Sequence, residues 1–268
     1  MLTRQRAAFA VFFLLCLLAA GCGQVDQDPF AGTLVDLSHA YDEQTVFWPT
    51  AEGFKLEKVA DGVTPQGYYY AANNFSTAEH GGTHLDAPVH FAAGHDTADA
   101  VPLERLLGAG VVVDVAERCA RDADYQVTAE DFAAWERVQG RIPDGAILLL
   151  RTGFGRRWPD RRSYMGTDER GPEAVAKLHF PGLHPDAARW LTRERKVKAV
   201  GLDTPSIDYG QSKFFESHRV LFEQNIPAFE NLANLERLPA KGFHVVALPM
   251  KIKGGSGGPL RAVAIVRE

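Results

Sequence analysis

The sequence predicts a single mixed α/β domain with layered sheets. Strand-like segments outnumber helix-like ones and no regular alternation of strand and helix persists, so a simple doubly wound fold is not indicated. The chain has 268 residues, of which 46% are hydrophobic and 24% charged, which is enough for one domain with a sizeable core. Residues 33–268 contain no internal repeat and no linker to a second domain. They are therefore expected to form one domain.

Residues 1–21 are predicted to be a secretory signal peptide. Arg4 and Arg6 form a short basic region, and the run from Ala7 to Ala20 is almost purely apolar. This run is shorter than the ~20 residues that a membrane-spanning helix needs. Small residues follow it, as they do at a signal-peptide cleavage site.

The segment that ends at Cys22 resembles the lipobox of bacterial lipoproteins. It reads Leu18-Ala19-Ala20-Gly21-Cys22, and the resemblance implies cleavage before Cys22 and attachment of lipid to this residue. Gly23 follows in place of the aspartate that would favour the inner membrane, so we expect an exported, periplasmic protein anchored to the outer membrane. A plain signal peptide with a coincidental cysteine is the alternative. Residues 22–32 would then be the tether between lipid and domain.

Charge and cysteine content narrow the possible partners. Removal of residues 1–21 leaves 27 basic and 34 acidic residues, and the net charge moves from −5 to −7. There is no basic block or Lys/Arg-rich helix, so nucleic acid is not expected as a partner. A lipidated Cys22 would leave Cys119 alone in the mature chain, which excludes an internal disulfide. Cys119 is expected to be a small buried residue rather than a nucleophile.

The elements of the domain follow from the hydrophobic pattern, taken in chain order. Strands are expected at residues 33–38, 54–59, 68–75, 111–115, 146–152, 197–204, 244–248 and 261–266. Helices are expected at 101–107, 129–138, 185–193 and 218–223, with Thr128 as the N-cap of the second and Pro185 in the first turn of the third. The arginine-rich stretch 156–173 is expected to be a surface excursion. Residues 254–259 are expected to be a mobile turn, although their glycines could also approach a substrate.

One stretch after the third expected strand concentrates metal-binding side chains. His80, His84, Asp86 and His90 lie within eleven residues. Imidazole and carboxylate groups are the ordinary ligands of a catalytic divalent metal, which can make a bound water nucleophilic near neutral pH. A solvent-exposed histidine cluster is the alternative, but the interposed aspartate and the neighbouring glycines favour a metal site.

The sequence of this cluster is not that of a helical zinc motif. Gly81 and Gly82 each disfavour a helix by about 1 kcal/mol, and Pro88 would cost about 3 kcal/mol in a helix interior. The segment is therefore expected to be a loop or a strand end. Its glycines would let the backbone curl so that His80 and His84 converge on one ion. A metalloprotease with two histidines on one helix face is not indicated.

Residues 80–91 resemble the H-x-G-T-H-x-D-x-P-x-H signature of the metal-dependent cyclase and kynurenine formamidase family, which also contains isatin hydrolases. Further matches lie at 149–153, 201–208 and 218–232, so the resemblance covers about residues 33–268. It implies the swivelling β/β/α architecture of cyclase-like domains and a homodimer. It also implies hydrolysis of a carbonyl C–N bond in a small amide, formamide or cyclic amide (a lactam), with an aryl substrate as one option.

The resemblance further implies the metal ligands. His80, His84 and Asp86 would bind a first metal. His218 and Glu230 would complete a second position, with Asp86 able to bridge the two. Members of the family are described with zinc and with manganese, and a His/Asp/Glu set without cysteine suits either ion, with one or two per chain.

His90 would act, by the same resemblance, as general base or proton shuttle rather than as a ligand. A nearby imidazole can pass a proton to the departing nitrogen. Two other activities stay open: a lactonase or cyclase/dehydratase at the same site, and a metal- or solute-binding lipoprotein without catalysis. His90 speaks against the second of these, because binding alone needs no base.

The sequence gives less information about the substrate pocket than about the metal site. Phe47, Trp48 and the run Tyr68–Tyr70 could form an aromatic wall for a planar ring, although aromatic residues more often belong to a core. The lead-in Asn73-Asn74-Phe75 resembles the isatin hydrolase branch somewhat more than the formamidase branch. The export signal also departs from a cytoplasmic role in tryptophan breakdown.

Three further polar residues are considered as site candidates. Asp203 lies at the end of an expected strand, where it could serve the site or cap a turn. His95 and His184 have no counterpart in the resemblance and are expected to be structural or exposed.

Overall fold

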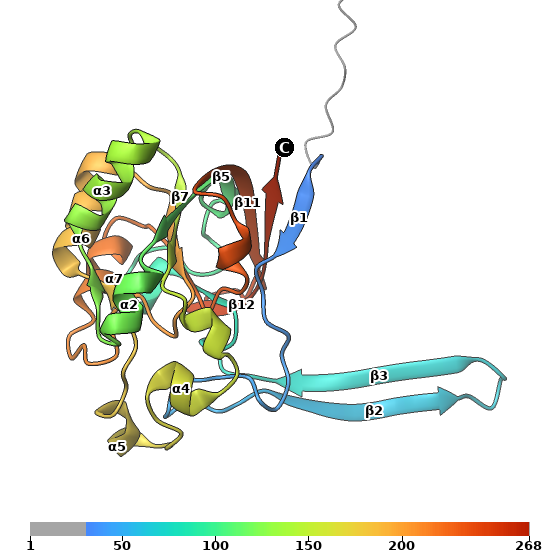
Figure 1. The fold of residues 1–268 in the computed structure, drawn as a ribbon. Coiled ribbons are helices and arrows are strands. Elements are labelled where there is room, and N and C mark those ends of the chain that lie inside the picture. The colour runs from blue at the N-terminus through green and yellow to red at the C-terminus, as the bar shows by residue number, and fades with distance from the viewer. Residues whose placement is uncertain (1–30, 268) are drawn as a thin grey trace, which may run out of the picture. The chain divides into compact units, whose positions relative to one another are not determined.

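The computed structural model of the protein describes residues 31–267 and is built around an eight-stranded sheet (Figure 1). In spatial order the strands are β1 (Thr33–Asp36), β12 (Gly257–Val266), β11 (Lys241–Pro249), β5 (Leu107–Asp114), β7 (Ile147–Arg151), β9 (Ala199–Leu202), β10 (Ala228–Glu230) and β4 (His84–Asp86). Because β4 also pairs with β12, the sheet closes into a barrel-like ring to which β1 is attached. The predicted mixed α/β single domain of cyclase-like type is confirmed.

Helices cover one side of this sheet (Figure 1). They are α2 (Ala116–Arg121), α3 (Ala129–Gln139), α6 (Pro185–Trp190) and α7 (Glu216–Phe222), and α6 continues into a π-helical turn over Leu191–Arg195. Shorter helices are α1 (Leu103–Leu106), α4 (Arg161–Met165) and α5 (Pro172–Val175), with 3-10 turns at Pro88–His90, Phe154–Arg157 and Leu235–Arg237. Two small sheets pair β2 (Lys55–Val63) with β3 (Tyr69–Ser76), and β6 (Gln126–Val127) with β8 (Gly182–Leu183).

Strand β7 shows why the sequences of the central strands are continuously apolar. Ile147 and Leu149 pack into the cluster that fills the barrel-like ring, whereas Leu148 and Leu150 pack into the cluster beneath the helices. Successive side chains of a strand point to opposite faces. A strand that is buried on both faces must therefore be apolar at every position, as β7 is.

The N-terminus of α3 forms as the sequence predicts. The carboxylate of Asp131 accepts hydrogen bonds from the backbone N–H (2.7 Å) and the hydroxyl (2.9 Å) of Thr128. This pairing satisfies polar groups that a helix start would otherwise leave free. Phe132 is then buried and stacks on Trp190 of α6, so the helix packs against its neighbour.

One expectation about loops is incomplete and another is wrong in part. The stretch 156–173 is not only a surface excursion, because it buries Tyr164, whose hydroxyl donates to Asn231 Oδ1 at 2.8 Å. Residues 257–259 are not a mobile turn but the buried start of β12, paired with β4. A Cβ at Gly257 would lie 2.5 Å from Leu85 O and 2.6 Å from His80 Cε1. Glycine is needed there because the two strands approach so closely.

The structure does not test the expectations for the N-terminal region. The signal peptide of residues 1–21, Cys22 and most of the tether lie outside the described residues. Over residues 31–267, no helix is long and apolar enough to cross a membrane. Cys119 is buried, and its burial raises the pKa of the thiol to about 12, so the predicted structural role is confirmed.

Candidate metal centre

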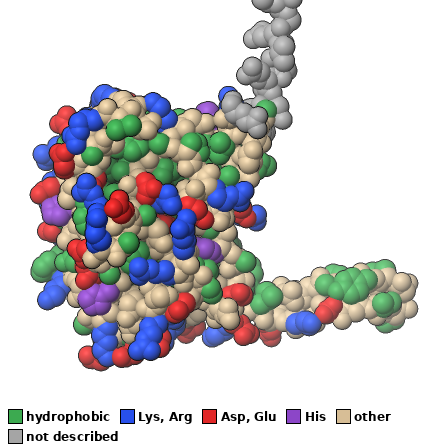
Figure 2. Space-filling model, in the orientation of Figure 1, with side chains coloured by type: hydrophobic (Ala, Val, Ile, Leu, Met, Phe, Trp, Pro, Cys, Tyr) green, Lys and Arg blue, Asp and Glu red, His purple; other side chains and the backbone are tan. Residues whose placement is uncertain are grey.

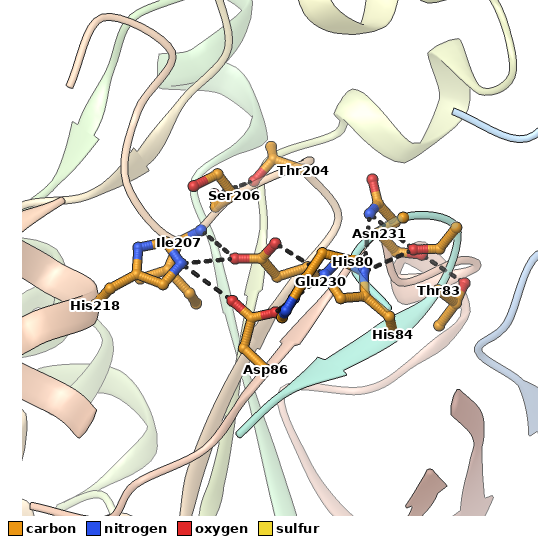
Figure 3. Close-up of polar contacts among 12 residues, drawn as sticks. His80, Thr83, His84, Asp86, Thr204, Ser206, Ile207, His218, Glu230 and Asn231 are labelled. Atoms are coloured by element: carbon orange, nitrogen blue, oxygen red, sulfur yellow. Dashed lines mark hydrogen bonds and ion pairs between the residues drawn. The ribbon is translucent and has the colours of Figure 1, made fainter. Parts of the chain in front are cut away.

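Strand pairing brings the two distant halves of the predicted site together. Strand β4 carries His84 and Asp86, and it pairs antiparallel with β10 so that Glu230 lies opposite His84. His218 lies on α7, and its ring nitrogen Nε2 is 3.2 Å from Asp86 Oδ2. Residues separated by more than 130 positions therefore share one buried cluster (Figure 3).

The backbone before β4 is held in a shape that favours glycine. Gly82 has a φ of +58°, and a Cβ there would meet the ring of Tyr41 at 2.5 Å. The Tyr41 hydroxyl lies 2.7 Å from the carbonyl oxygens of both Gly81 and Thr83, which share its one donor hydrogen. This turn delivers His80 and His84 to the same side, as the glycines predicted.

The ring nitrogen Nε2 of His84 is placed to bind a cation. Its Nδ1 is 2.9 Å from the carbonyl of Gly82, so Nδ1 carries the proton and Nε2 has a lone pair. That Nε2 is buried, lies 3.0 Å from Asp86 Oδ1 and 3.4 Å from Glu230 Oε2, and forms no hydrogen bond in the described part of the chain. A lone pair among carboxylate oxygens is repulsive unless positive charge lies between them.

His218 repeats this arrangement from the other side of the cluster. Its Nδ1 donates to Asp208 Oδ2 at 2.6 Å, so Nε2 is the ring nitrogen that faces the cluster. Nε2 then lies 3.2 Å from Asp86 Oδ2 and 3.1 Å from Glu230 Oε1. A carboxylate that fixes the tautomer of a ligand histidine is a regular feature of metal sites.

His80 is the more exposed member of the cluster. Its Nδ1 is 2.6 Å from Asp86 Oδ1, and its Nε2 is 2.9 Å from the hydroxyl of Ser256. The Ser256 hydroxyl donates in turn to Glu79 Oε2 at 2.6 Å, so it accepts from His80. His80 is thereby oriented with Nδ1 toward Asp86.

The electrostatics of the cluster also favour a bound cation. Burial opposes ionisation of Asp86, but the charge of His80 and hydrogen bonds from the histidines outweigh it and hold the pKa of Asp86 well below its ordinary value. Burial and the charge of Asp86 raise the pKa of Glu230. Burial lowers the pKa of His218, but hydrogen bonds that its ring donates to Asp208, Asp86 and Glu230 raise the pKa well above its ordinary value. The buried carboxylates thus draw positive charge to this point.

The residues present fit a divalent metal. Two overlapping groups have ligand atoms within 4.8 Å of one another, and Asp86 belongs to both. The first is His80, His84 and Asp86, and the second is Asp86, His218 and Glu230. The structure therefore brings together the five residues that the family resemblance implies as ligands, in the same two sets.

His90 lies beside the cluster without joining either group. Its ring stacks on that of His80 with centroids 3.8 Å apart. Burial lowers the pKa of His90 to about 4, so the imidazole is neutral at neutral pH and able to accept a proton.

A cavity of about 290 Å³ opens over the cluster. Besides the cluster it has an aromatic wall, made of Phe47, Trp48, Phe91 and Phe215. Phe47 and Trp48 lie where the aromatic-wall expectation placed them, but Tyr68–Tyr70 are exposed on another part of the molecule. The volume suits a small aromatic ligand.

The three remaining candidates do not line this cavity. Asp203 is buried and accepts from the backbone N–H groups of Thr152 (2.8 Å) and Gly153 (3.0 Å), so it anchors a turn. His95 contacts Asn225, and His184 accepts from Asp186 N at the start of α6.

Sequence reasoning missed the residues that hold the ligands in place. Asp208 orients His218, and Asn231 Nδ2 donates to the same Gly82 carbonyl that fixes His84. Both lie inside segments that carried the resemblance. Asp208 could have been suspected as an acid ten residues before a ligand histidine, but nothing in the spacing distinguishes it from a turn residue.

Replacement of Asp208 by asparagine is expected to weaken metal binding by about 10–100-fold, because the histidine it orients would lose its fixed tautomer. Competition with a chelator would measure the affinity. The matched control is Asp186→Asn, which removes the same charge from a residue paired with Arg189. Equal affinities in the two variants would show that Asp208 does not position His218.

A barrel-like mixed α/β domain with a buried His/Asp/Glu cluster under an aromatic pocket defines the chain as a metal-dependent hydrolase. A model of the putative cyclase family matches residues 35–209, so the chain belongs to the cyclase family.

The similarity of the chain to individual proteins agrees with this family membership. The chain is 36% identical to isatin hydrolase of Roseibium aggregatum over 208 residues, which is 75% of this chain and 76% of that protein. It is 28% identical to kynurenine formamidase of Salinibacter ruber, over 86% and 96% of the two chains. Isatin hydrolase A from Labrenzia aggregata, solved with benzyl benzoate bound, superposes with a TM-score of 0.79 at 33% identity, over 88% of this chain and 94% of that one.

Proposed function

We propose that this hydrolase opens the carbonyl C–N bond of a small aromatic cyclic amide. The observation that carries the proposal is the pocket, in which the metal-binding cluster and His90 lie beneath an aromatic wall. The similarity to isatin hydrolase supports a cyclic amide, since isatin is an aromatic lactam. The benzyl benzoate bound by a structural neighbour supports an aromatic carbonyl compound.

His80, His84 and Asp86 would hold a first metal, and Asp86, His218 and Glu230 a second. Bound there, a divalent metal would supply a Lewis acid for the substrate carbonyl and lower the pKa of water. Because the donor set contains nitrogen and oxygen but no sulfur, zinc and manganese both suit it. Occupancy by one ion or by two is consistent with the shared Asp86.

The side chains of this pocket would bind the substrate, exclude water and transfer the proton. Phe91 and Phe215 would pack on the ring of the substrate and exclude water from the reacting bond. His90, neutral at neutral pH, would take the proton released by the attacking water and return it to the departing nitrogen. The stacking on His80 would keep the His90 ring beside the cluster.

Hydrolysis assays on isatin, N-formylkynurenine and a simple aromatic lactone test the substrate class. We expect kcat/KM to be highest for isatin by at least tenfold. Preference for the lactone would replace the proposal with a lactonase. Tightly bound metal without turnover of any of the three would indicate a binding protein.

We further propose that the mature enzyme is a periplasmic homodimer anchored to the outer membrane through lipid on Cys22. The basic start, the short apolar run and the lipobox-like segment support export and lipid attachment. Metabolic labelling with radioactive palmitate tests the anchor. Label in the parent but not in Cys22→Ser is expected, and equal labelling of both would contradict it.

A further inference from the structure

Phe47 and Trp48 of the aromatic wall belong to a loop, residues 47–51, which we call the wall loop. Phe47 forms an isolated bridge with Gly81, and the wall loop is part of no strand in the described chain. Backbone carbonyl groups outside a sheet need other hydrogen-bond donors. The groups that donate to the wall loop therefore decide where the aromatic wall stands relative to the metal-binding cluster.

Arg161, the first residue of α4, is one of these donors. Its Nη1 donates to the carbonyl of Phe47 at 2.6 Å, and its Nη2 donates to the carbonyl of Glu169 at 3.2 Å. A planar guanidinium can bridge two acceptors, and hydrogen bonds from a charged donor are roughly twice as strong as neutral ones. Arg161 thereby ties the wall loop to the chain beyond α4.

Two further contacts continue this attachment along the wall loop. The carbonyl of Ala51 accepts from Arg170 Nη2 at 2.6 Å. The carbonyl of Pro49 accepts from the backbone N–H of Gly171 at 2.9 Å. Alternate carbonyls of the wall loop are thus held from one side by the segment that begins with α4. Figure 1 shows the chain before β2 running past α4 and α5.

The segment that contains α4 is otherwise rich in charge that faces solvent. Figure 2 shows Lys/Arg and Asp/Glu side chains gathered at the end of the domain where α4 and α5 lie. Arg162 is exposed, whereas Arg161 is half-buried and its Nε is buried without a hydrogen bond among the described residues. Two neighbouring arginines therefore differ, and Arg161 is the one that turns toward the pocket.

Helix α4 also supports the turn before β4 by a separate path. The hydroxyl of Tyr164 donates to Asn231 Oδ1 at 2.8 Å, and Asn231 Nδ2 donates to the carbonyl of Gly82 at 2.8 Å. The ring of Phe47 lies against Gly81 of the same turn, where a Cβ would clash with it. The wall loop and the metal-binding turn are therefore both positioned by α4.

We propose that Arg161 is a positioning residue that sets the specificity of the pocket for a planar aromatic ring. By holding the carbonyl of Phe47, it fixes the side chains of Phe47 and Trp48 over the metal-binding cluster, so that a ring bound there presents its carbonyl to the cluster. Arg170 supports the other end of the wall loop. The inference rests on the proposed function, because it takes the aromatic wall to be the surface that binds the ring of the substrate.

Loss of Arg161 should weaken binding of the ring rather than the chemical step. Its side chain donates to Phe47 and Glu169, and neither belongs to the two groups of metal-binding residues. Binding that is equal in the ground state and the transition state appears in KM and not in kcat. We therefore expect Arg161→Ala to raise KM for an aromatic amide and to leave kcat and the metal content unchanged.

Two competitive inhibitors of the full-length enzyme separate the wall from the metal. Indole has a planar aromatic ring without a carbonyl group and should bind to the wall, whereas acetohydroxamate has no ring and binds divalent metals through its oxygens. In Arg161→Ala the inhibition constant of indole is expected to rise about tenfold, because the wall loop would spend only a fraction of the time in its binding position. The inhibition constant of acetohydroxamate is expected to stay at the parent value.

The matched control is Arg162→Ala, which removes the same charge from the next residue and should keep the parent values for both inhibitors. An unchanged indole constant in Arg161→Ala, an equal rise in Arg162→Ala, or an equal rise for both inhibitors would each overturn the proposal. If Arg161→Ala does not fold, Arg170→Ala provides the test, since Arg170 is exposed. A rise confined to indole is expected there too, and parent values would overturn the proposal.

The substrate proposal can fail separately. If the parent hydrolyses neither an amide nor a lactone, equilibrium dialysis of indole against the same variants replaces the kinetics. Weaker binding of indole by Arg161→Ala than by Arg162→Ala would still support the role of Arg161. Equal binding by the two variants would overturn it.

Discussion

Replacement of His90 by alanine is expected to leave the metal content unchanged and to lower kcat by about 10²–10⁴-fold. His90 belongs to neither group of metal-binding side chains, yet its ring stacks on His80 at the edge of the cluster. Its burial keeps it neutral at neutral pH and therefore available as a base. Elemental analysis and steady-state kinetics on the same preparation would measure both quantities.

The control for this substitution is His95→Ala, which removes an imidazole outside the pocket and should change neither quantity. Two results would contradict the assignment. If His90→Ala hydrolyses as fast as the parent, His90 does not move the proton. If it loses metal, His90 is a ligand.

Replacement of His84 by alanine is expected to abolish metal retention through purification, and turnover with it. His84 offers a buried Nε2 that forms no hydrogen bond among the described residues and lies between carboxylate oxygens of Asp86 (3.0 Å) and Glu230 (3.4 Å). Loss of a direct ligand should exceed the 10–100-fold loss of affinity expected for an outer partner such as Asp208. Elemental analysis of the dialysed protein provides the measurement.

A second variant separates metal loss from misfolding. His84→Asn keeps a polar side chain of smaller size, and circular dichroism would show whether the domain still folds. The control is His184→Ala, which removes a half-buried imidazole outside the cavity and should keep its metal. A folded His84→Asn protein that binds metal as tightly as the parent would show that His84 is not a ligand.

The near half of the site could be predicted from the sequence because local chemistry carries it. His80, His84 and Asp86 are close in the chain, and the glycines beside them imply a curled backbone rather than a helix. The long apolar run around β7 similarly indicated a strand buried on both faces. In both cases the sequence pattern that allows the prediction spans no more than about a dozen residues.

The far half could not be predicted from local pattern. His218 and Glu230 reach the cluster only because β10 pairs with β4 and α7 packs nearby, which is a property of the sheet order. Family resemblance supplied these two residues, but it did not reveal Asp208 or Asn231. Both act through hydrogen bonds to other site residues, and such a role leaves no mark in spacing.

The hairpin of β2 and β3 shows a different kind of failure of prediction from the sequence. Because they stand shortly before the metal motif, the aromatic residues Tyr68–Tyr70 are candidates for the pocket wall. The structure exposes them, since the hairpin carries its tip away from the domain. The register between β2 and β3, which shifts between Lys58 and Ala60, decides which side chains share a face of this hairpin.

Titration of metal-free protein with Mn²⁺ or Zn²⁺, with hydrolysis recorded at every step, tests the central claim most directly. The substrate is the amide that the untreated protein turns over fastest. We predict that the rate rises in proportion to bound metal and saturates at one or two equivalents per chain, as the two groups that share Asp86 require. Hydrolysis at the full rate in metal-free protein would contradict the account.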